Sequence, residues 1–414
     1  MPRVFNPAVT LITPGSEGLC APARFLGPRF DSIPEREADV LLIGCGAIGS
    51  VIAKHLVASD AIGQCVCADV DPGAAKRVAS ETRSPKARAS ALDAGDPDAL
   101  RDAMSGIRVV VNATVPRFND AILGAALESG ADYVDLAMGD PDPFERHNAW
   151  KAKGRTALTG MGEDPGLSNV YARYAADRMD RVDAIRVRDG ETASNPDYPF
   201  IALFSPETLV EETVAPATVY RDGAWLELPA LSEFENYPFP EPVGTLQVCT
   251  VDHEEVTTLP RFLGKPVANV DFRLALDPPT VDRLRTFRDM GFLQGGARRA
   301  LFERIPKPAD LVGRVDGYAI VLVEVEGEKD VARRTHTLYS ILEHHEAGRK
   351  YGATGTAYLT GTGGAIGALL LASGRVEEHG VLSPESLDPM PILTMLRERG
   401  VEVRERVTSE RAVN

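Results

Sequence analysis

From residue 38 to residue 159, short apolar runs alternate with segments in which apolar residues recur at the spacing of a helix. The apolar runs predict strands at 39–44, 64–69, 87–92, 107–112, 131–136 and 155–159. The segments between them predict helices at 47–58, 97–104, 118–129 and 142–152, with a further helix opened by Asp71-Pro72-Gly73. Strands that alternate with helices imply a parallel, doubly wound sheet of the α/β class.

Beyond residue 165 the chain changes to longer runs in which polar and apolar residues alternate. A linking helix is expected at 166–179, followed by alternating runs at 182–188, 217–220, 224–228, 245–251, 267–276, 315–326 and 331–341. Asp222-Gly223 between two of these runs predicts a tight hairpin. Residues 279–291, 361–372 and 390–399 predict helices, and 295–310 predicts a mobile loop. This pattern indicates a second, α+β domain built on a mixed or antiparallel sheet.

The length of 414 residues suggests two domains, which we place at 38–165 and 166–354, with an arm at 1–37 and a C-terminal segment at 355–414. The net charge of −15 argues against a nucleic-acid or anionic-membrane surface. No apolar run reaches the ~20 residues that span a bilayer, and residues 1–37 lack the pattern of a signal peptide. The five cysteines are scattered, which predicts free thiols in a reducing, cytoplasmic setting and no metal site.

The first predicted strand leads directly into Gly44-Cys45-Gly46-Ala47-Ile48-Gly49, and Asp69 ends the next strand 20 positions after Gly49. A strand, a glycine turn, a helix and a strand-end carboxylate form the layout of a Rossmann dinucleotide-binding unit. The glycines allow a tight turn and bring a pyrophosphate close to the helix N-terminus. Asp69 is expected to bind ribose hydroxyls and to favour NAD, while Lys76 and Arg77 on the next helix leave NADP open.

The other predicted cofactor contacts lie where further strands end, because ligands of such sheets sit at the carboxyl ends of strands. Asp93 follows the third strand and is placed at the adenine, with a turn-capping role as the alternative. The segment from Asn112 to Pro116 ends the fourth strand and borders the nicotinamide ribose. The full set of predicted cofactor contacts is Gly44, Gly46, Ala47, Ile48, Gly49, Asp69, Val70, Asp93, Asn112, Ala113, Thr114 and Pro116.

Candidate catalytic groups follow on the same rim. Asp135 ends the fifth strand, where a carboxylate binds an ammonium, moves a proton or only caps the turn. Glu163 is not explained by capping, whereas Asp164-Pro165 begins the linking helix and suits a domain hinge. We therefore take Asp135 and Glu163 as catalytic candidates. The substrate-binding candidates are Asp135, Gly162, Glu163, Asp164, Pro165 and His253, with His253 also a candidate base or an interface histidine.

Several blocks, in order along roughly residues 38–405, resemble the saccharopine dehydrogenase-like family. In the first half they are Leu42 to Gly49, Val110 to Ala113, Gly130 to Asp135 and Asp164 to Asn169. In the second half they are Ser205 to Thr208, Tyr220 to Gly223, Val251 to Glu255 with Thr258-Leu259-Pro260, and Gly380 to Glu385. The block around Asp164-Pro165-Gly166, together with the one ending in Tyr133-Val134-Asp135, is far more specific than the glycine turn.

The resemblance implies an enzyme that transfers a hydride between a nicotinamide, NAD or NADP, and the C–N carbon of an amine, imine or amino acid. It places Asp135 in the cleft, returns the C-terminal helices to the first domain and implies homodimers through the second sheet. Val70 after the strand-end acid and Gly162 before Glu163 depart from saccharopine reductases and favour a lysine 6-dehydrogenase-like activity. A carboxynorspermidine-type synthase, which would need a more acidic cleft, and a non-catalytic NAD-binding sensor are the alternatives.

Overall fold

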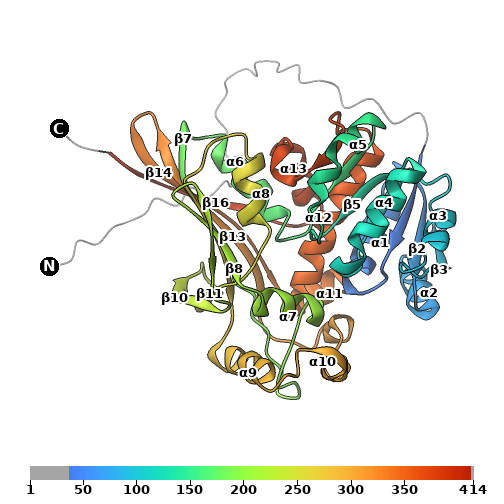
Figure 1. Cartoon of the computed structure of the whole chain (residues 1–414), viewed down its shortest axis with the longest axis horizontal. Coiled ribbons are helices and arrows are strands. Elements are labelled where there is room, and N and C mark those ends of the chain that lie inside the picture. Colours follow the sequence, from blue (N-terminus) through green and yellow to red (C-terminus); the bar gives the residue numbers. More distant parts are fainter. Residues whose placement is uncertain (1–36, 412–414) are drawn as a thin grey trace, which may run out of the picture.

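The computed structural model describes residues 37–411, and Figure 1 shows two sheets with helices packed around and between them. The expected N-terminal arm at 1–37 lies outside the described residues except for Glu37.

The first sheet has seven parallel strands in the order β15-β6-β5-β4-β1-β2-β3. These strands are β1 (Ala38–Ile43), β2 (Ile62–Asp69), β3 (Ala87–Ala91), β4 (Val109–Asn112), β5 (Asp132–Asp135), β6 (Thr156–Leu158) and β15 (Gly380–Leu382). Its helices are α1 (Ala47–Val57), α2 (Pro72–Glu81), α3 (Pro97–Ala103), α4 (Asn119–Ser129) and α5 (His147–Ala152), with short 3₁₀ turns at Pro116–Phe118 and Pro143–Arg146. The predicted doubly wound sheet is thereby confirmed.

Alternate residues of β1 enter two different cores, which explains why the strand reads as a continuous apolar run. Val40 and Leu42 belong to the core that also contains Ile52 of α1, whereas Leu41 and Ile43 face the core formed with α3, α4 and α5. A strand covered by helices on both faces has no polar side. The order of the strands reverses at β1, so the space above the carboxyl ends of β1 and β4 is where such sheets hold ligands.

The second sheet has nine strands in a mixed arrangement, of which seven follow the order β10-β11-β12-β7-β13-β14-β16, while β8 pairs with β12 and β9 pairs with β8. Their bounds are β7 (Arg181–Asp189), β8 (Ala217–Arg221), β9 (Ala224–Leu228), β10 (Ser232–Pro238), β11 (Thr245–Thr250), β12 (Asn269–Ala275), β13 (Tyr318–Lys329), β14 (Ala332–Glu343) and β16 (Arg404–Glu410). Asp222 and Gly223, with φ of 48° and 81°, join β8 to β9 in the predicted hairpin. The mixed sheet is also confirmed.

Most of the remaining helices lie against this sheet or between the two sheets, while the helices at 278–289 and 295–302 lie below the sheets in the view of Figure 1. The remaining helices are α6 (Leu167–Ala176), α7 (Pro206–Val214), α8 (Glu255–Phe262), α9 (Pro278–Asp289), α10 (Gly295–Phe302), α11 (His344–Tyr351), α12 (Gly355–Ala372) and α13 (Pro389–Glu398), with 3₁₀ turns at Pro308–Leu311 and Pro384–Ser386. The expected mobile loop at 295–310 is wrong for its first part, because α10 and the ion pair of Arg298 with Glu211 of α7 order it. The sequence pattern also missed α7, α8, α11 and the edge strands β10, β15 and β16.

The almost wholly buried helix α12 joins the two halves, because it packs against α1 and against β4 and β5 of the first sheet and also contacts β13 and β14. Glycines allow this close packing. A Cβ on Gly363 would collide with the backbone oxygen of Gly162, and one on Gly361 would collide with Val51 of α1. Gly363 therefore holds α12 against the loop that carries Glu163.

We expect Gly363→Ala to lower the free energy of unfolding by about 1–3 kcal/mol, because the added methyl group overpacks a contact made by backbone atoms. Urea denaturation measures this change. Gly296→Ala is the matched control: a Cβ there meets nothing within 4 Å, and alanine favours the helix by about 1 kcal/mol. Equal stabilities of the two variants would contradict the packing role of Gly363.

Candidate active site

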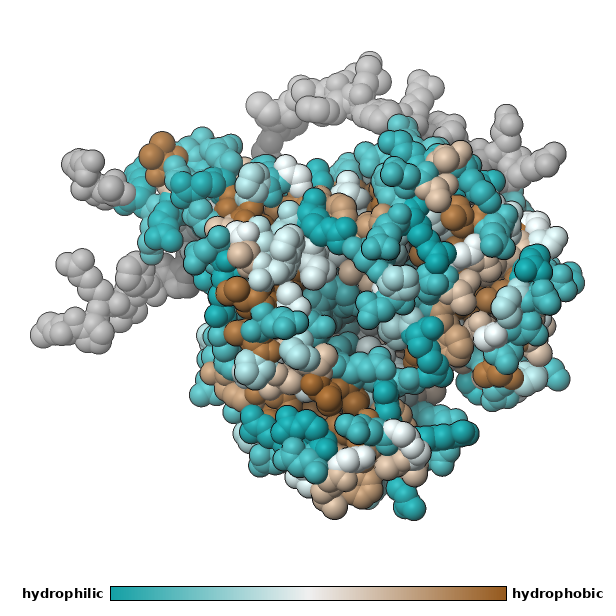
Figure 2. Space-filling model, in the orientation of Figure 1, coloured by the Kyte–Doolittle hydropathy of each residue, from teal (hydrophilic) through white to brown (hydrophobic). Residues whose placement is uncertain are grey.

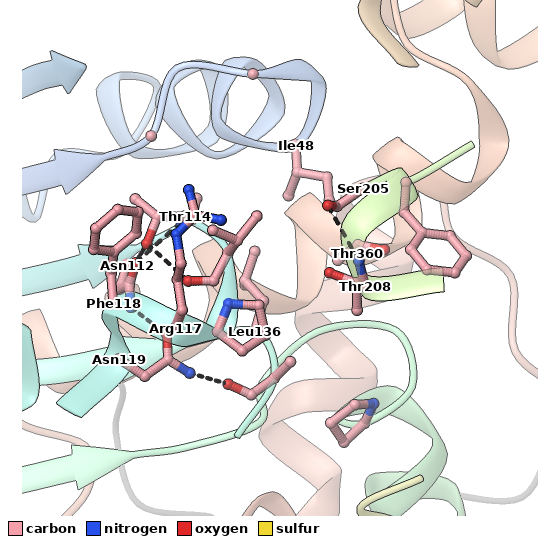
Figure 3. A pocket seen from close by; sticks show the side chains of 18 of the residues that line it. Ile48, Asn112, Thr114, Arg117, Phe118, Asn119, Leu136, Ser205, Thr208 and Thr360 are labelled. Carbon is pink, nitrogen blue, oxygen red and sulfur yellow. Dashed lines mark hydrogen bonds between the residues drawn. The ribbon is translucent and has the colours of Figure 1, made fainter. Parts of the chain in front are cut away.

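A deep cleft of about 560 Å³ lies between the carboxyl ends of β1, β2 and β4 and the wall formed by α7, β12 and the start of α8. Figure 2 shows a hollow between the two halves of the molecule, bordered mainly by hydrophilic side chains. In Figure 3, Thr114 and Arg117 lie on the side of the first sheet, while Ser205 and Thr208 of α7 face them from the other side. The cleft is thus built by both halves of the chain.

The glycine turn at the end of β1 leaves a helix N-terminus open toward the cleft. Gly44 turns with a φ of 102°, and Gly46 is the N-cap of α1, without a side-chain cap or an acidic residue in the first turn. The first N–H groups of α1 therefore stay available to an anion. A Cβ on Gly49 would collide with the Gly44 carbonyl oxygen, so this glycine lets the helix pack on the strand. The arrangement fits a bound pyrophosphate.

Asp69 connects the end of β2 to this turn. Its Oδ2 accepts the Cys45 N–H at 2.7 Å and its Oδ1 accepts the Asp71 N–H at 2.8 Å, and the residue lines the cleft. The residue that follows the acid is Val70, which is 70% exposed and carries no charge. Arg77 donates to the Cys45 carbonyl oxygen at 3.3 Å, which brings one guanidinium near the turn. A carboxylate in this position suits ribose hydroxyls.

Further along the rim, Asn112 organises the end of β4. Its Oδ1 accepts the Thr114 N–H at 3.0 Å and the Thr114 hydroxyl at 2.6 Å. Its Nδ2 donates to Asn119 at 2.7 Å and to the Tyr133 hydroxyl at 3.0 Å. The side chains of Asn112, Thr114 and Asn119 appear together in Figure 3. This network shapes the wall of the cleft where the nicotinamide half of the cofactor is expected.

Most of the predicted cofactor and substrate residues line the cleft. They are Gly44, Gly46, Ile48, Asp69, Val70, Asp93, Asn112, Ala113, Thr114, Pro116, Glu163, Asp164, Pro165 and His253. Asp93 also accepts the Gly95 N–H at 2.8 Å, so it stabilises a turn as well. Ala47, Gly49 and Gly162 lie outside the lining: Gly49 packs on Gly44, and Gly162 packs on α12. Gly162 was predicted to bind substrate, and in the structure its backbone packs closely against Gly363 and Thr360 of α12.

Asp135 was expected to touch the ligands, and the structure places it beneath the cleft wall instead. The residue is 3% exposed and does not line the cleft. Its carboxylate accepts the Gly160 N–H at 2.7 Å and the Tyr133 hydroxyl at 2.9 Å. Burial raises its pKa to about 7. Asp135 therefore lies outside the cleft lining, and its carboxylate holds the loop after β6.

Five carboxyl groups gather on the substrate side of the cleft. They are Glu163, Asp164, Asp189, Glu212 and Glu254. Asp189 ends β7, Glu212 lies on α7 and Glu254 precedes α8, so three distant segments supply acids that the sequence did not single out. We call these five residues the acidic wall. Within residues 37–411, the only basic side chains in the cleft lining are Arg117 and His253.

Burial dominates the electrostatics of the acidic wall. It raises the pKa of Glu212 to about 8 and that of Asp189 to about 6. The pKa values of Glu163 and Asp164 also lie well above the usual range, first because of burial and then because of the neighbouring carboxyl groups. Oδ2 of Asp164 is buried and has no hydrogen-bond partner among the described residues. The wall thus retains protons that an approaching cation would displace.

His253 is the cationic member of this site. It is 8% exposed and stacks on Phe272 with ring centroids 3.7 Å apart. Its Nδ1 is hydrogen-bonded to Glu255, whose carboxylate accepts the Ser168 hydroxyl at 2.6 Å. Although burial lowers its pKa, the carboxylates of Glu255, Glu254 and Glu212 raise it to about 10. With Nδ1 held by Glu255, Nε2 is the ring nitrogen left for a ligand.

The ligating atoms of His253, Glu254 and Glu255 lie within 4.8 Å of one another. Nδ1 of His253 already bonds to Glu255, and Glu254 Oε1 accepts the Met138 N–H at 3.1 Å. His253 and Glu255 therefore form a hydrogen-bonded ion pair, and the neighbouring Glu254 is bonded to the backbone of Met138.

We expect the melting temperature of the cofactor-free protein to fall as the pH rises from about 5 to about 9. The buried carboxyl groups hold protons that the unfolded chain releases above its ordinary pKa near 4.5, so folding becomes less favourable up to about pH 8. The stabilisation by protonated His253 is complete below pH 6.5 and is lost as the pH rises to about 10. Scanning calorimetry at several pH values measures how steeply the melting temperature falls with pH, and Glu212→Gln should make this dependence weaker. A melting temperature that rises across this range would contradict the assignment.

Comparison with known proteins agrees with this geometry. The family model described as "Saccharopine dehydrogenase NADP binding domain" matches residues 40–158. The family model described as "Saccharopine dehydrogenase C-terminal domain" matches residues 162–401. A carboxyaminopropylagmatine dehydrogenase of a Synechocystis strain is 26% identical, with 88% of this chain and 96% of that protein covered. A carboxynorspermidine synthase of Vibrio cholerae is 25% identical, with 87% of this chain and 95% of that protein covered.

Two solved structures share the fold. Saccharopine dehydrogenase (L-Glu forming) from Saccharomyces cerevisiae has a TM-score of 0.67 at 17% identity and covers 90% of this chain and 100% of its own. The homospermidine synthase of Legionella pneumophila, in complex with NAD, has a TM-score of 0.69 at 13% identity and covers 90% of this chain and 92% of its own. Among the described residues, no helix is long and apolar enough to cross a membrane.

Proposed function

Because the chain belongs to the saccharopine dehydrogenase family of NAD(P)-dependent oxidoreductases acting on C–N bonds, we propose that it reduces the imine formed between a diamine or polyamine and a carboxylate-bearing aldehyde. The acidic wall carries this proposal. Five carboxyl groups around one cleft suit a substrate with more than one ammonium group. Lysine also brings two ammonium groups, but its carboxylate neutralises one of them, so it needs a smaller excess of acids.

The names of the relatives support the same substrate class. Carboxynorspermidine and carboxyaminopropylagmatine are both amines that carry a carboxyl group. The sequence alone favoured a lysine 6-dehydrogenase-like activity and kept the carboxynorspermidine type as the alternative that requires an acidic cleft. The acidic wall and these relatives favour that alternative. Oxidation of lysine is the second candidate, supported by the departures at Val70 and Gly162.

The carboxylate of the aldehyde needs a cation, and Arg117 is the better placed of the two in the cleft. Its side chain is 58% exposed and is ion-paired to Glu207 at the start of α7, so it bridges the two sides of the cleft. A guanidinium binds a carboxylate through paired N–H donors. His253 is already engaged by Glu255. We assign the carboxylate to Arg117 and leave His253 for proton transfer.

The chemistry requires proton transfers that these residues suit. The free amine attacks the carbonyl carbon, the carbinolamine loses water, and the C=N bond forms. Nε2 of His253 donates the proton that leaves with the water. Glu163 or Asp164, once a second ammonium group of the bound amine has displaced its proton, accepts the proton lost by the attacking ammonium. A reduced nicotinamide, when bound, would supply the hydride for the iminium carbon, and the C=N π electrons would become the lone pair of the secondary amine.

The cofactor is NAD or NADP, and we propose a preference for NAD. The Asp69 carboxylate ends β2, where such folds bind the adenosine ribose, so it would repel a 2′-phosphate, and exposed Val70 offers no counter-charge. Arg77 is the residue that would moderate this preference, since its guanidinium bonds to the glycine turn.

The experiment that tests the function is an assay of NADH and NADPH oxidation with an amino-acid semialdehyde and a panel of amines: putrescine, 1,3-diaminopropane, agmatine and lysine. Oxidation that needs both a diamine and the aldehyde supports the proposal. Reduction of NAD by lysine alone would favour the second candidate. Tight cofactor binding without turnover in either direction would instead indicate a cofactor-binding sensor.

We also propose a homodimer formed through the face of the second sheet that faces away from α6 and α8. Half-buried Tyr237, Leu246, Tyr339 and Ile341 lie on this face, packed over a buried apolar cluster of Phe239, Val248, Ile320 and Leu322. Among the described residues, the cluster contains strand and loop residues and no helix residue. Light scattering on the purified protein tests the dimer, and a monomer at micromolar concentration would overturn it.

A further inference from the structure

A second cavity of about 510 Å³ adjoins the cleft. Its lining and that of the cleft share Phe204 and Leu274, so these two side chains form the partition between the two spaces. The cavity lies among the segment after β7, the start of β11 and the end of β12. Among the residues that the structure describes, its lining comes only from 191–318 and includes none of the predicted cofactor contacts.

The lining of this cavity suits a cationic chain with methylene groups. Leu203, Leu209 and Leu276 supply apolar walls, while Glu191 and Asp277 supply carboxylates. Asp316 also lines it and bonds to His345 at 2.9 Å. Within the described part of the chain, no lysine, arginine or histidine lines the cavity. Apolar stretches between acids complement an amine with separated ammonium groups.

Glu191 connects the two spaces. Asp189 lines the cleft, and Glu191, two residues further, lines the cavity. Two residues of extended chain span roughly 7 Å, a separation that a short methylene chain bridges. The Glu191 carboxylate also accepts a hydrogen bond from the Thr356 hydroxyl, and Thr356 lines the cleft. The carboxylates thus continue from the acidic wall into the second cavity.

We propose that the second cavity receives the distal ammonium end of a long polyamine whose reacting nitrogen lies in the cleft. The methylene chain of this polyamine passes between Phe204 and Leu274, whose position determines how long the chain must be to reach the second cavity. This inference rests on the proposed function and identifies the substrate class more narrowly, as an amine with at least three nitrogens. Burial and the nearby Asp189 raise the pKa of Glu191 to about 8, so binding of an ammonium there should release a proton.

Gln247→Lys tests the inference, because Gln247 lines the second cavity and not the cleft. The added cation should repel a distal ammonium. With NADH and the same semialdehyde, kcat/KM for spermidine should fall about tenfold or more, while kcat/KM for 1,3-diaminopropane should change less than twofold. Gln247→Glu is the matched control of similar size and should keep or raise kcat/KM for spermidine. Equal losses for both amines, or no loss for either, would overturn the inference.

A binding measurement separates this inference from the proposed function. Titration calorimetry of spermidine into the protein with NAD, in two buffers of different ionisation enthalpy, reports affinity and proton release without turnover. Tenfold weaker binding to Gln247→Lys than to Gln247→Glu would support the second cavity even if the imine reduction fails. Turnover of diamines with unchanged spermidine binding in Gln247→Lys would support the function and refute the cavity.

Discussion

We expect His253→Asn to lower kcat for the proposed imine reduction by about a hundredfold or more and to leave the Kd for NADH within about twofold. His253 lines the substrate side of the cleft, and its Nδ1 is fixed by Glu255, which leaves Nε2 as the donor. With a pKa of about 10 the ring is an imidazolium at neutral pH, so it acts as an acid and not as a base. Asparagine keeps a hydrogen-bonding amide and removes the transferable proton. Steady-state kinetics and a fluorescence titration with NADH measure the two quantities.

His336→Asn is the control for this variant. His336 is also buried and also paired with a glutamate, Glu405, but it lies in β14 of the second sheet and does not line the cleft. Its replacement should leave kcat near that of the unchanged protein. A positioning role for Glu255 adds a second readout: Glu255→Gln removes a carboxylate that raises the His253 pKa, so the alkaline limb of the pH–kcat profile should move to lower pH. Unchanged kcat in His253→Asn would remove this residue from the chemistry.

The second large effect concerns the cofactor: Asp69→Ala should weaken NADH binding by roughly 10- to 100-fold and NADPH binding much less. The carboxylate is expected to bind two ribose hydroxyls through charge-assisted hydrogen bonds, and its removal also abolishes its repulsion of a 2′-phosphate. The ratio of the two Kd values therefore shifts toward NADPH. Fluorescence titrations of both reduced cofactors measure the ratio.

Asp71→Ala separates the ribose contact from general effects on this turn. Asp71 caps α2 by accepting the Gly73 N–H at 2.8 Å, and it does not line the cleft. Its loss should cost about 1 kcal/mol of stability and leave the ratio of cofactor affinities unchanged. Asp69 also holds the Cys45 N–H, so some loss of NADPH affinity is expected as the turn loosens. An unchanged NADH to NADPH ratio in Asp69→Ala would refute the ribose role.

The sequence alone predicted the parts of the molecule that local interactions determine. The apolar run of β1, the glycine turn and the strand-end Asp69 lie within 32 residues, and their spacing is set by backbone geometry. The hairpin at Asp222-Gly223 follows in the same way, because the two residues adopt the positive φ values that the turn requires. The loop from Glu163 to Pro165 was placed correctly at the cleft, since strand ends of a parallel sheet share one edge.

Other features depended on contacts between distant segments, which only the tertiary structure decides. The sequence pattern of a strand-end aspartate is the same whether its side chain faces a ligand or the next loop. Hydrogen bonds from Gly160 and Tyr133 hold the Asp135 carboxylate outside the cleft lining. The acids at Asp189, Glu212 and Glu254 have no common spacing, because they come from β7, α7 and the start of α8. Hydrophobic periodicity shows which face of an element is buried and not which other element covers it. The sequence therefore determined the fold class and the cofactor turn, and the packing of the two sheets around α12 decided the charge of the substrate site.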